Sequence, residues 1–75
     1  MDNNEIAVKV KENLAASFIR CRKMQNMTQQ ELANRSGVAR PNIARFESGK
    51  YNPTVDFLVK ISGALGKKLI IELKD

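Results

Sequence analysis

Residues 31–50 read ELANRSGVARPNIARFESGK and combine polar side chains with a tight turn. Gly37 separates two helix-like segments, and the second segment carries Arg40, Asn42 and Arg45. Residues three apart on a helix share a face, so Asn42 and Arg45 lie together, while Arg40 opens the same helix. A guanidinium can bond guanine O6 and N7 as a fork, and a carboxamide can pair with adenine N6 and N7. The pattern indicates a face built for polar recognition.

The composition gives no support to catalysis or to metal binding. The chain contains no histidine and a single cysteine, Cys21, which is expected to be a small core residue because no histidine can activate it. There is no paired-carboxylate motif and no glycine loop of the kind that cradles phosphate. We therefore expect no catalytic residue, no metal site, no cofactor, no small-molecule ligand and no intramolecular disulfide.

The charge of the chain favours an anionic partner without requiring one. Its 75 residues carry 13 Lys and Arg against 8 Asp and Glu, a formal net charge of +5. Such a balance suits a nucleic acid, but it serves solubility and non-specific association as well. Apolar runs such as Leu69–Ile71 are far shorter than the roughly 20 residues of a membrane-spanning helix. We expect one cytoplasmic domain covering residues 1–75, with no membrane partner.

A long amphipathic helix is predicted from residue 5 to about residue 25. Apolar side chains recur there every four positions, which is the pattern of a helix that buries one face. The stripe consists of Ile6, Val10, Leu14 and Phe18, joined by Ala15 and Cys21. Asp2 or Asn3 can cap the start of this helix through a side-chain oxygen.

A helix-turn-helix is predicted over residues 28–47. Thr28 stands three residues before Glu31, which is the spacing of a capping box at a helix start. Leu32 begins the buried face of this short helix, which should end near residue 36. Gly37 then stops it, because glycine adopts the left-handed conformation without a Cβ penalty.

The second helix of this pair is predicted to run from residue 40 to residue 47. Ile43 and Phe46 face inward at a spacing of three. Pro41 fits in the first turn, where its missing N–H would have had no helical partner.

A fourth helix and a terminal strand complete the expected fold. Thr54 can cap a helix over residues 54–65, in which Val55, Leu58, Val59, Ile61, Ala64 and Leu65 have helical spacing and which Gly66 ends. Over residues 68–74 the apolar side chains alternate instead, which is the period of a strand. We therefore predict an all-α fold, a compact bundle of four to five helices, with a short C-terminal β-strand.

A lone strand cannot satisfy its own backbone N–H and C=O groups. The simplest resolution is antiparallel pairing with the same strand of a second copy, which closes a two-fold homodimer. The residues predicted to form this dimer interface are Leu69, Ile70, Ile71 and Leu73.

Several spaced signatures in residues 20–66 resemble the lambda-repressor and Cro-like, or XRE, family of helix-turn-helix DNA-binding proteins. TQQELANRSGV resembles the first motif helix and turn, IARFESGKYNP resembles the end of the recognition helix and its loop, and LVKISGALG resembles the next helix. The resemblance covers about two-thirds of the chain and implies that double-stranded DNA is the partner.

The resemblance also implies roles for individual residues. The positions expected to meet bases are Ala39, Arg40, Pro41, Asn42 and Arg45. The positions expected to contact phosphates are Gln29, Ser48, Lys50 and Asn52. The matching family positions of Arg22 and Glu47 form an ion pair between the first and third helices.

Two positions depart from the family pattern. Ala39 replaces a serine or threonine, which removes a helix cap typically worth about 1 kcal/mol and one polar groove contact. Pro41 replaces a residue that often bonds a base, and it can offer only apolar contact, for example to a thymine methyl.

Two functions follow as hypotheses, and neither is that of an enzyme. The first is a sequence-specific transcriptional repressor, associated with DNA in a bacterial or phage-like context, that binds as a dimer to an inverted-repeat operator. The alternative is the antitoxin of a toxin-antitoxin pair, which binds a toxin protein and represses its own operon. Small domains of this family that end in a strand like GKKLIIEL resemble such antitoxins, and the long first helix could form part of the partner surface.

Overall fold

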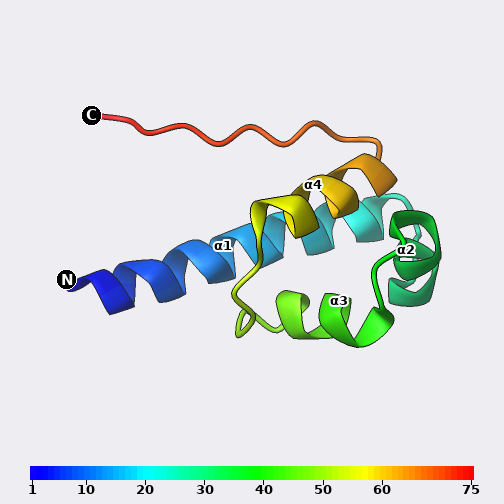
Figure 1. Cartoon of the computed structure of the whole chain (residues 1–75), viewed down its shortest axis with the longest axis horizontal. Coiled ribbons are helices and arrows are strands. Elements are labelled where there is room, and N and C mark those ends of the chain that lie inside the picture. Colours follow the sequence, from blue (N-terminus) through cyan, green and yellow to red (C-terminus); the bar gives the residue numbers. More distant parts are fainter.

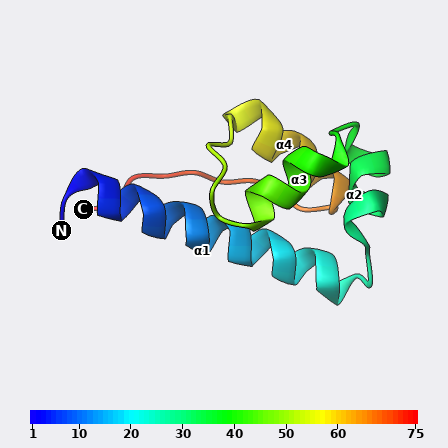
Figure 2. The ribbon, with the colours of Figure 1, turned by 90° about the horizontal axis from the view of Figure 1, so that it is seen from below.

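The computed structural model describes residues 1–75 and contains four α-helices and no strand. The helices are α1 (Asn3–Met24), α2 (Gln29–Ser36), α3 (Arg40–Glu47) and α4 (Val55–Ala64). The three short helices gather around the C-terminal half of α1, whereas its N-terminal half and the tail, residues 67–75, extend past them on the same side (Figures 1 and 2). At about 1.5 Å per residue, the 22 residues of α1 account for most of the 37 Å longest dimension.

Side-chain caps define where three of the helices begin. The Asp2 carboxylate accepts from the Glu5 backbone N–H at 2.8 Å. Thr28 Oγ1 accepts from the Glu31 N–H at 3.0 Å, and the Glu31 carboxylate accepts from the Thr28 N–H at 3.1 Å, so both halves of the predicted capping box are present. Thr54 caps α4 in the same way. These contacts satisfy N–H groups that have no partner inside the helix.

The turn between α2 and α3 has the predicted geometry. Gly37 adopts φ +75°, in the left-handed region, and its N–H donates to the Ala33 carbonyl at 3.0 Å. Ala39 occupies the N-cap of α3 without a side-chain hydrogen bond, and Pro41 lies in the first turn. The turn therefore depends on the backbone freedom of glycine rather than on a polar cap at α3.

Aromatic side chains from three elements form the centre of the core. The ring of Phe46 on α3 meets Phe18 of α1 edge to face at a centroid distance of 5.2 Å, and Phe57 of α4 at 5.4 Å. Such edge-to-face pairs are favourable beyond the area that they bury. The buried cluster consists of Phe18, Met27, Leu32, Ala33, Ile43, Phe46, Phe57, Leu58, Ile61 and Leu65.

Only the second half of the α1 stripe is buried. Phe18 is 8% exposed and packs in the core, whereas Ile6 and Val10 are 45% and 57% exposed. The expectation that the whole stripe faces a core was therefore wrong for its first half. The short helices do not extend far enough along α1 to cover its first turns (Figures 1 and 2).

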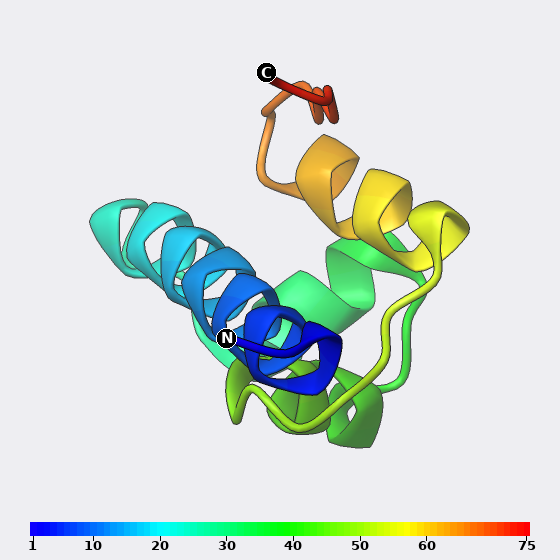
Figure 3. The ribbon, with the colours of Figure 1, turned by 90° about the vertical axis from the view of Figure 1, so that its left-hand side faces the viewer.

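The predicted strand over residues 68–74 is absent from the structure, and this expectation is corrected. The tail has no regular secondary structure, and Ile70, Ile71 and Leu73 are 71%, 64% and 101% exposed. Figure 3 shows the tail passing the end of α4 and running apart from α1. A strand requires a neighbour for its backbone hydrogen bonds, and the helices offer none.

Candidate nucleic-acid interface

α3 presents two arginines to solvent because its apolar residues hold it against the core. Ile43 is 0% exposed and Phe46 is 2% exposed, so the face that they define is fully covered. Arg40 and Arg45 lie on the uncovered part of the helix, and both are exposed. Their guanidinium groups form no salt bridge within the chain. The two cations are therefore free to bind a ligand that approaches α3.

Asn42 lies less openly than its sequence position suggests. It is half-buried and lines a hollow between α3 and the start of α4, together with Tyr51, Asp56 and Lys60. Ala39, at the start of the helix, lines the same hollow. A base edge would have to approach this hollow to meet the Asn42 carboxamide. Ala39 and Pro41 are both exposed and add an apolar surface next to Arg40.

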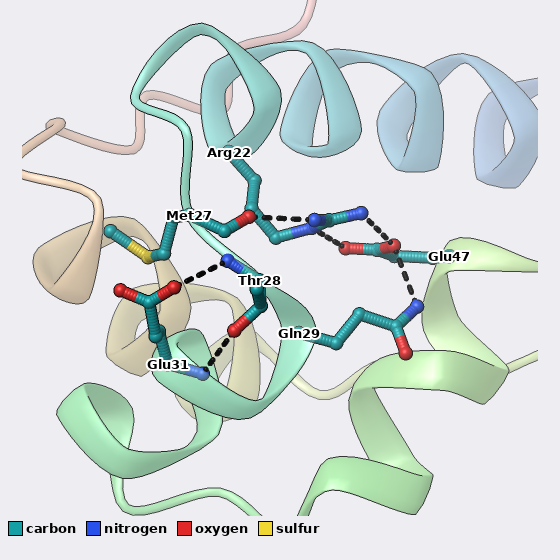
Figure 4. A network of polar contacts seen from close by, with 6 residues as sticks. All are labelled: Arg22, Met27, Thr28, Gln29, Glu31 and Glu47. Carbon is teal, nitrogen blue, oxygen red and sulfur yellow. Dashed lines mark hydrogen bonds and ion pairs between the residues drawn. The ribbon is translucent and has the colours of Figure 1, made fainter.

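Glu47 joins three helices through one carboxylate (Figure 4). Arg22 of α1 donates from Nε to Glu47 Oε2 at 2.7 Å and from Nη2 to Oε1 at 2.9 Å, a two-bond fork. Its third donor, Nη1, reaches the Met27 carbonyl at 2.8 Å. Gln29 of α2 donates from Nε2 to Glu47 Oε1 at 2.9 Å. The side chains of the ion pair are only 11% and 7% exposed, so each charge depends on its partner.

This network fixes the end of the presented helix. Glu47 is the last residue of α3, and its three side-chain bonds come from α1 and α2, the elements on which α3 rests. Gln29 therefore braces α3, and its amide nitrogen retains a second hydrogen for an external acceptor. The family resemblance implied the ion pair between Arg22 and Glu47.

The capping box of α2 perturbs one titratable group. Hydrogen bonds from the Thr28 backbone N–H and hydroxyl hold the pKa of the Glu31 carboxyl below its ordinary value. Both bonds favour the charged carboxylate, and the nearby Arg35 acts in the same direction. The ionised capping box therefore stabilises the first turn of α2.

The Ser48 hydroxyl and the backbone of Gly49 determine the shape of the loop after α3. Ser48 Oγ donates to the Arg45 carbonyl at 2.6 Å and accepts from the Lys50 N–H at 3.4 Å. Gly49 between them adopts φ +81°. The Ser48 hydroxyl is thus used to hold the loop, whereas the ammonium group of Lys50 forms no salt bridge in the chain and is exposed.

One contact of this loop was missed by sequence reasoning. Lys11 Nζ donates to Asn52 Oδ1 at 2.9 Å across 41 positions of sequence. No local pattern signals such a contact, because it depends on how the loop after α3 crosses α1.

The chain contains neither a cluster of metal-ligating side chains nor a helix that could span a membrane. No group of three or more His, Cys, Asp or Glu side chains is arranged to hold a metal ion. No helix has both the length and the apolar character needed to cross a lipid bilayer.

Comparison with known proteins gives the family of the chain. A helix-turn-helix family model matches residues 19–71. A transcriptional regulator of the helix-turn-helix type from Haemophilus influenzae is 40% identical over 58 residues, which cover 77% of this chain and 59% of that protein. Another from Archaeoglobus fulgidus is 48% identical over 44 residues, which cover 59% of this chain and 62% of that protein.

A named repressor is among the relatives. The cryptic phage CTXphi transcriptional repressor RstR of Vibrio cholerae is 40% identical over 58 residues, which cover 77% of this chain and 48% of that protein. The matched segment thus spans between about half and three-fifths of these three relatives. No solved structure gives a significant match. From the family match and these relatives, the chain belongs to the XRE-type helix-turn-helix family of transcriptional regulators.

Proposed function

We propose that this protein is a sequence-specific double-stranded-DNA-binding repressor that acts as a dimer on an inverted-repeat operator. The observation that carries the proposal is the geometry of α3, which is anchored by Ile43 and Phe46 and leaves Arg40 and Arg45 exposed and without ion-pair partners. A helix held in this way fits the major groove with its polar side chains toward the base edges.

Base reading is assigned to the polar side chains of α3. Arg40 and Arg45 can each form a fork to guanine, and Asn42 can pair with adenine at the edge of its hollow. Ala39 and Pro41 offer apolar contact, which suits a thymine methyl. The proposed operator half-site therefore combines guanine contacts with an apolar position.

Backbone contacts are assigned to the flanks of α3. Gln29 has one amide hydrogen left over after bonding Glu47, and Lys50 carries an unpaired ammonium group. Asn52 lies in the same loop, and Ser48 supports that loop through its hydroxyl. Such contacts set the position of the protein on the duplex without reading its sequence.

The dimer is assigned to the tail. Beyond Lys67, whose N–H donates to the Ser62 carbonyl at 2.9 Å, the tail backbone forms no hydrogen bond in the chain, and Leu69, Ile71 and Leu73 alternate with Ile70 as in a strand. Antiparallel pairing of two tails would satisfy both backbones and cover these side chains. A two-fold dimer would place its two α3 helices in successive major grooves about 34 Å apart.

Selection of bound sequences from a random duplex pool tests the proposal. An inverted repeat should be enriched, and its affinity should stay above that for random DNA as salt rises. In the selected site, Arg45→Ala should relax the preference at one base pair and cost about 1 to 3 kcal/mol, whereas Lys50→Ala should weaken all duplexes alike. A pool without enrichment, or equal losses for the two variants on every duplex, would refute sequence-specific reading.

Deletion of residues 67–75 tests the tail interface. The buried cluster ends at Leu65, and the tail adds to it only the half-buried Leu69, which packs against it, so the truncated chain should keep its helical spectrum. Sedimentation at micromolar concentration should show a monomer where the full chain is a dimer. If the truncated chain remains dimeric, two-fold contact must lie elsewhere, for example on α4.

An antitoxin role is a second candidate, favoured by the exposed apolar face of α1. Ile6 and Val10, four positions apart on one face of α1, are 45% and 57% exposed and precede the family match at residue 19. Such a face on a projecting helix suits a protein partner. Co-expression with the product of a neighbouring gene tests it: the full chain should relieve growth arrest, and an Ile6→Asp, Val10→Asp variant should not, although it still binds DNA. A neighbour without toxicity, or a variant that protects fully, would exclude this role.

A further inference from the structure

The contact between α1 and the loop after α3 points to a DNA-binding residue outside the helix-turn-helix. We propose that Lys11 binds a backbone phosphate and orients the Asn52 amide so that its hydrogens face the same phosphate strand. The inference rests on the proposed DNA-binding function. Lys11 precedes the family match at residue 19, so the family pattern assigns it no role.

The loop is held closely against α1 on one side and the core on the other. A Cβ placed on Gly49 would lie 3.4 Å from Glu12 Cγ, so the loop backbone passes close to α1 at the position next to Lys11. The Tyr51 ring packs against Phe57 at a centroid distance of 5.1 Å. Both neighbours of Lys50 are thus packed against other elements, and Asn52 follows them at its contact with Lys11.

The hydrogen bond between Lys11 and Asn52 determines which end of the amide is free. An ammonium group has only donors, so its partner at 2.9 Å must be the carbonyl oxygen Oδ1 of Asn52. The Nδ2 hydrogens are then left for another acceptor. A phosphate oxygen accepts and never donates, so this orientation is the one that it can bind. Without Lys11, the Asn52 amide could turn and present its oxygen to the phosphate.

Lys11 also contributes its own charge. One of its three donors is used on Asn52, which leaves two for a phosphate oxygen. The carboxylate of Glu12 follows in sequence, but adjacent helix positions are about 100° apart and face different directions. The Glu12 stem lies at Gly49, whereas Lys11 contacts Asn52, so the two side chains meet different residues of the loop. Lys11 therefore adds a cation beside Asn52, in addition to Lys50 two residues earlier in the loop.

The salt dependence of binding tests the charge of Lys11. Fluorescence anisotropy of a mixed-sequence duplex of about 25 base pairs, between about 50 and 200 mM salt, gives the slope of log K against log salt. Lys11→Met should reduce the magnitude of the slope by about 0.9, the loss of one phosphate contact. Lys9→Met is the matched control, because positions 9 and 11 lie on opposite faces of α1 and its slope should equal that of the wild type. Lys11→Arg should restore the slope.

Substitution of Asn52 tests the orienting role. Asn52→Ala should weaken binding in the wild type but much less in the Lys11→Met protein, since the amide is then no longer held. Asn52→Asp should weaken binding more than Asn52→Ala, because it keeps an acceptor for Lys11 and offers the phosphate a negative oxygen. Thermal melting checks that each variant is folded.

The outcomes separate this inference from the proposed function. A wild-type chain that fails to bind the duplex even at low salt would overturn the proposed function. A wild-type chain that binds, with equal slopes for Lys11→Met and Lys9→Met or with additive losses for Lys11→Met and Asn52→Ala, would overturn the role of Lys11 alone.

Discussion

The helical bundle buries the same residue types that its two projecting ends, the first half of α1 and the tail, leave exposed to solvent. In the bundle, Ile61 is fully buried at 0% exposure, and the Arg22–Glu47 ion pair is nearly enclosed. On the projecting ends, Ile6 is 45% exposed, and the Glu72–Lys74 pair is open to solvent at 3.7 Å. Residue type alone therefore does not decide how much a side chain stabilises the fold, because burial depends on which elements pack together.

The bundle and the projecting ends also differ in what their side chains contact. The bundle positions α3 by apolar packing and by the contacts of Glu47, which come from two other helices. The ends carry apolar side chains that nothing in the chain covers, which is the property of surfaces that meet another molecule.

The largest expected difference is between two isoleucines. Ile61→Ala should lower the free energy of unfolding by about 4 kcal/mol, because it leaves a cavity in the packed core. Ile6→Ala should change it by less than about 0.5 kcal/mol in the monomer, since that side chain stays half exposed. Urea unfolding at concentrations that keep the chain monomeric measures both. Similar losses would mean that the first half of α1 is buried in solution.

A smaller difference is expected between two ion pairs. Glu47→Ala should cost about 3 kcal/mol, because it leaves the Arg22 guanidinium nearly buried and without its carboxylate. Glu72→Ala removes an exposed pair of the tail and should cost less than about 0.5 kcal/mol. Thermal unfolding of both variants at the same salt concentration makes the comparison. Equal melting temperatures would show that the Glu47 network does not hold the bundle together.

Two helix caps should differ by less again. Thr28→Ala removes the cap of α2, a helix packed into the bundle, and should lower global stability by about 1 kcal/mol. Asp2→Ala removes the cap of α1 and should only fray its projecting first turns, which can open without the bundle. Hydrogen exchange distinguishes these results: protection should fall throughout the bundle in the first variant and only near residue 5 in the second. A global loss from Asp2→Ala would contradict the separation of the two regions.

The smallest effect is a dependence of stability on pH through Glu31. Its pKa is lower in the folded chain than in the unfolded chain, so its contribution is complete at neutral pH and is lost as the pH falls through the lowered value. Glu31→Gln should therefore lose some stability near neutral pH, and the difference from the wild type should shrink in acid. Urea midpoints at about pH 7 and about pH 3 test this. A difference that stays constant between the two would assign the stabilisation to packing rather than to charge.

Some features of the candidate site could be predicted from neighbours in the sequence, whereas others depend on contacts between distant elements. The positions of Arg40 and Arg45 could be inferred from Gly37 and the apolar pair of α3, because those signals act within a few residues. The partial burial of Asn42 and its hollow beside Lys60 could not, since they require the start of α4 to be placed next to α3. Lys11 was missed for the same reason, because its partner is 41 residues away.

The sequence by itself determined the features that depend on neighbours in the chain. The capping box at Thr28, the left-handed turn at Gly37 and the bounds of α3 all arise from interactions over at most four residues, which any copy of this segment carries with it. The tertiary structure decided which apolar side chains are covered. Ile6 and residues 70–73 match the patterns of a buried helix and a strand, yet they remain exposed because burial and strand pairing require a second surface, and the folded chain supplies none there.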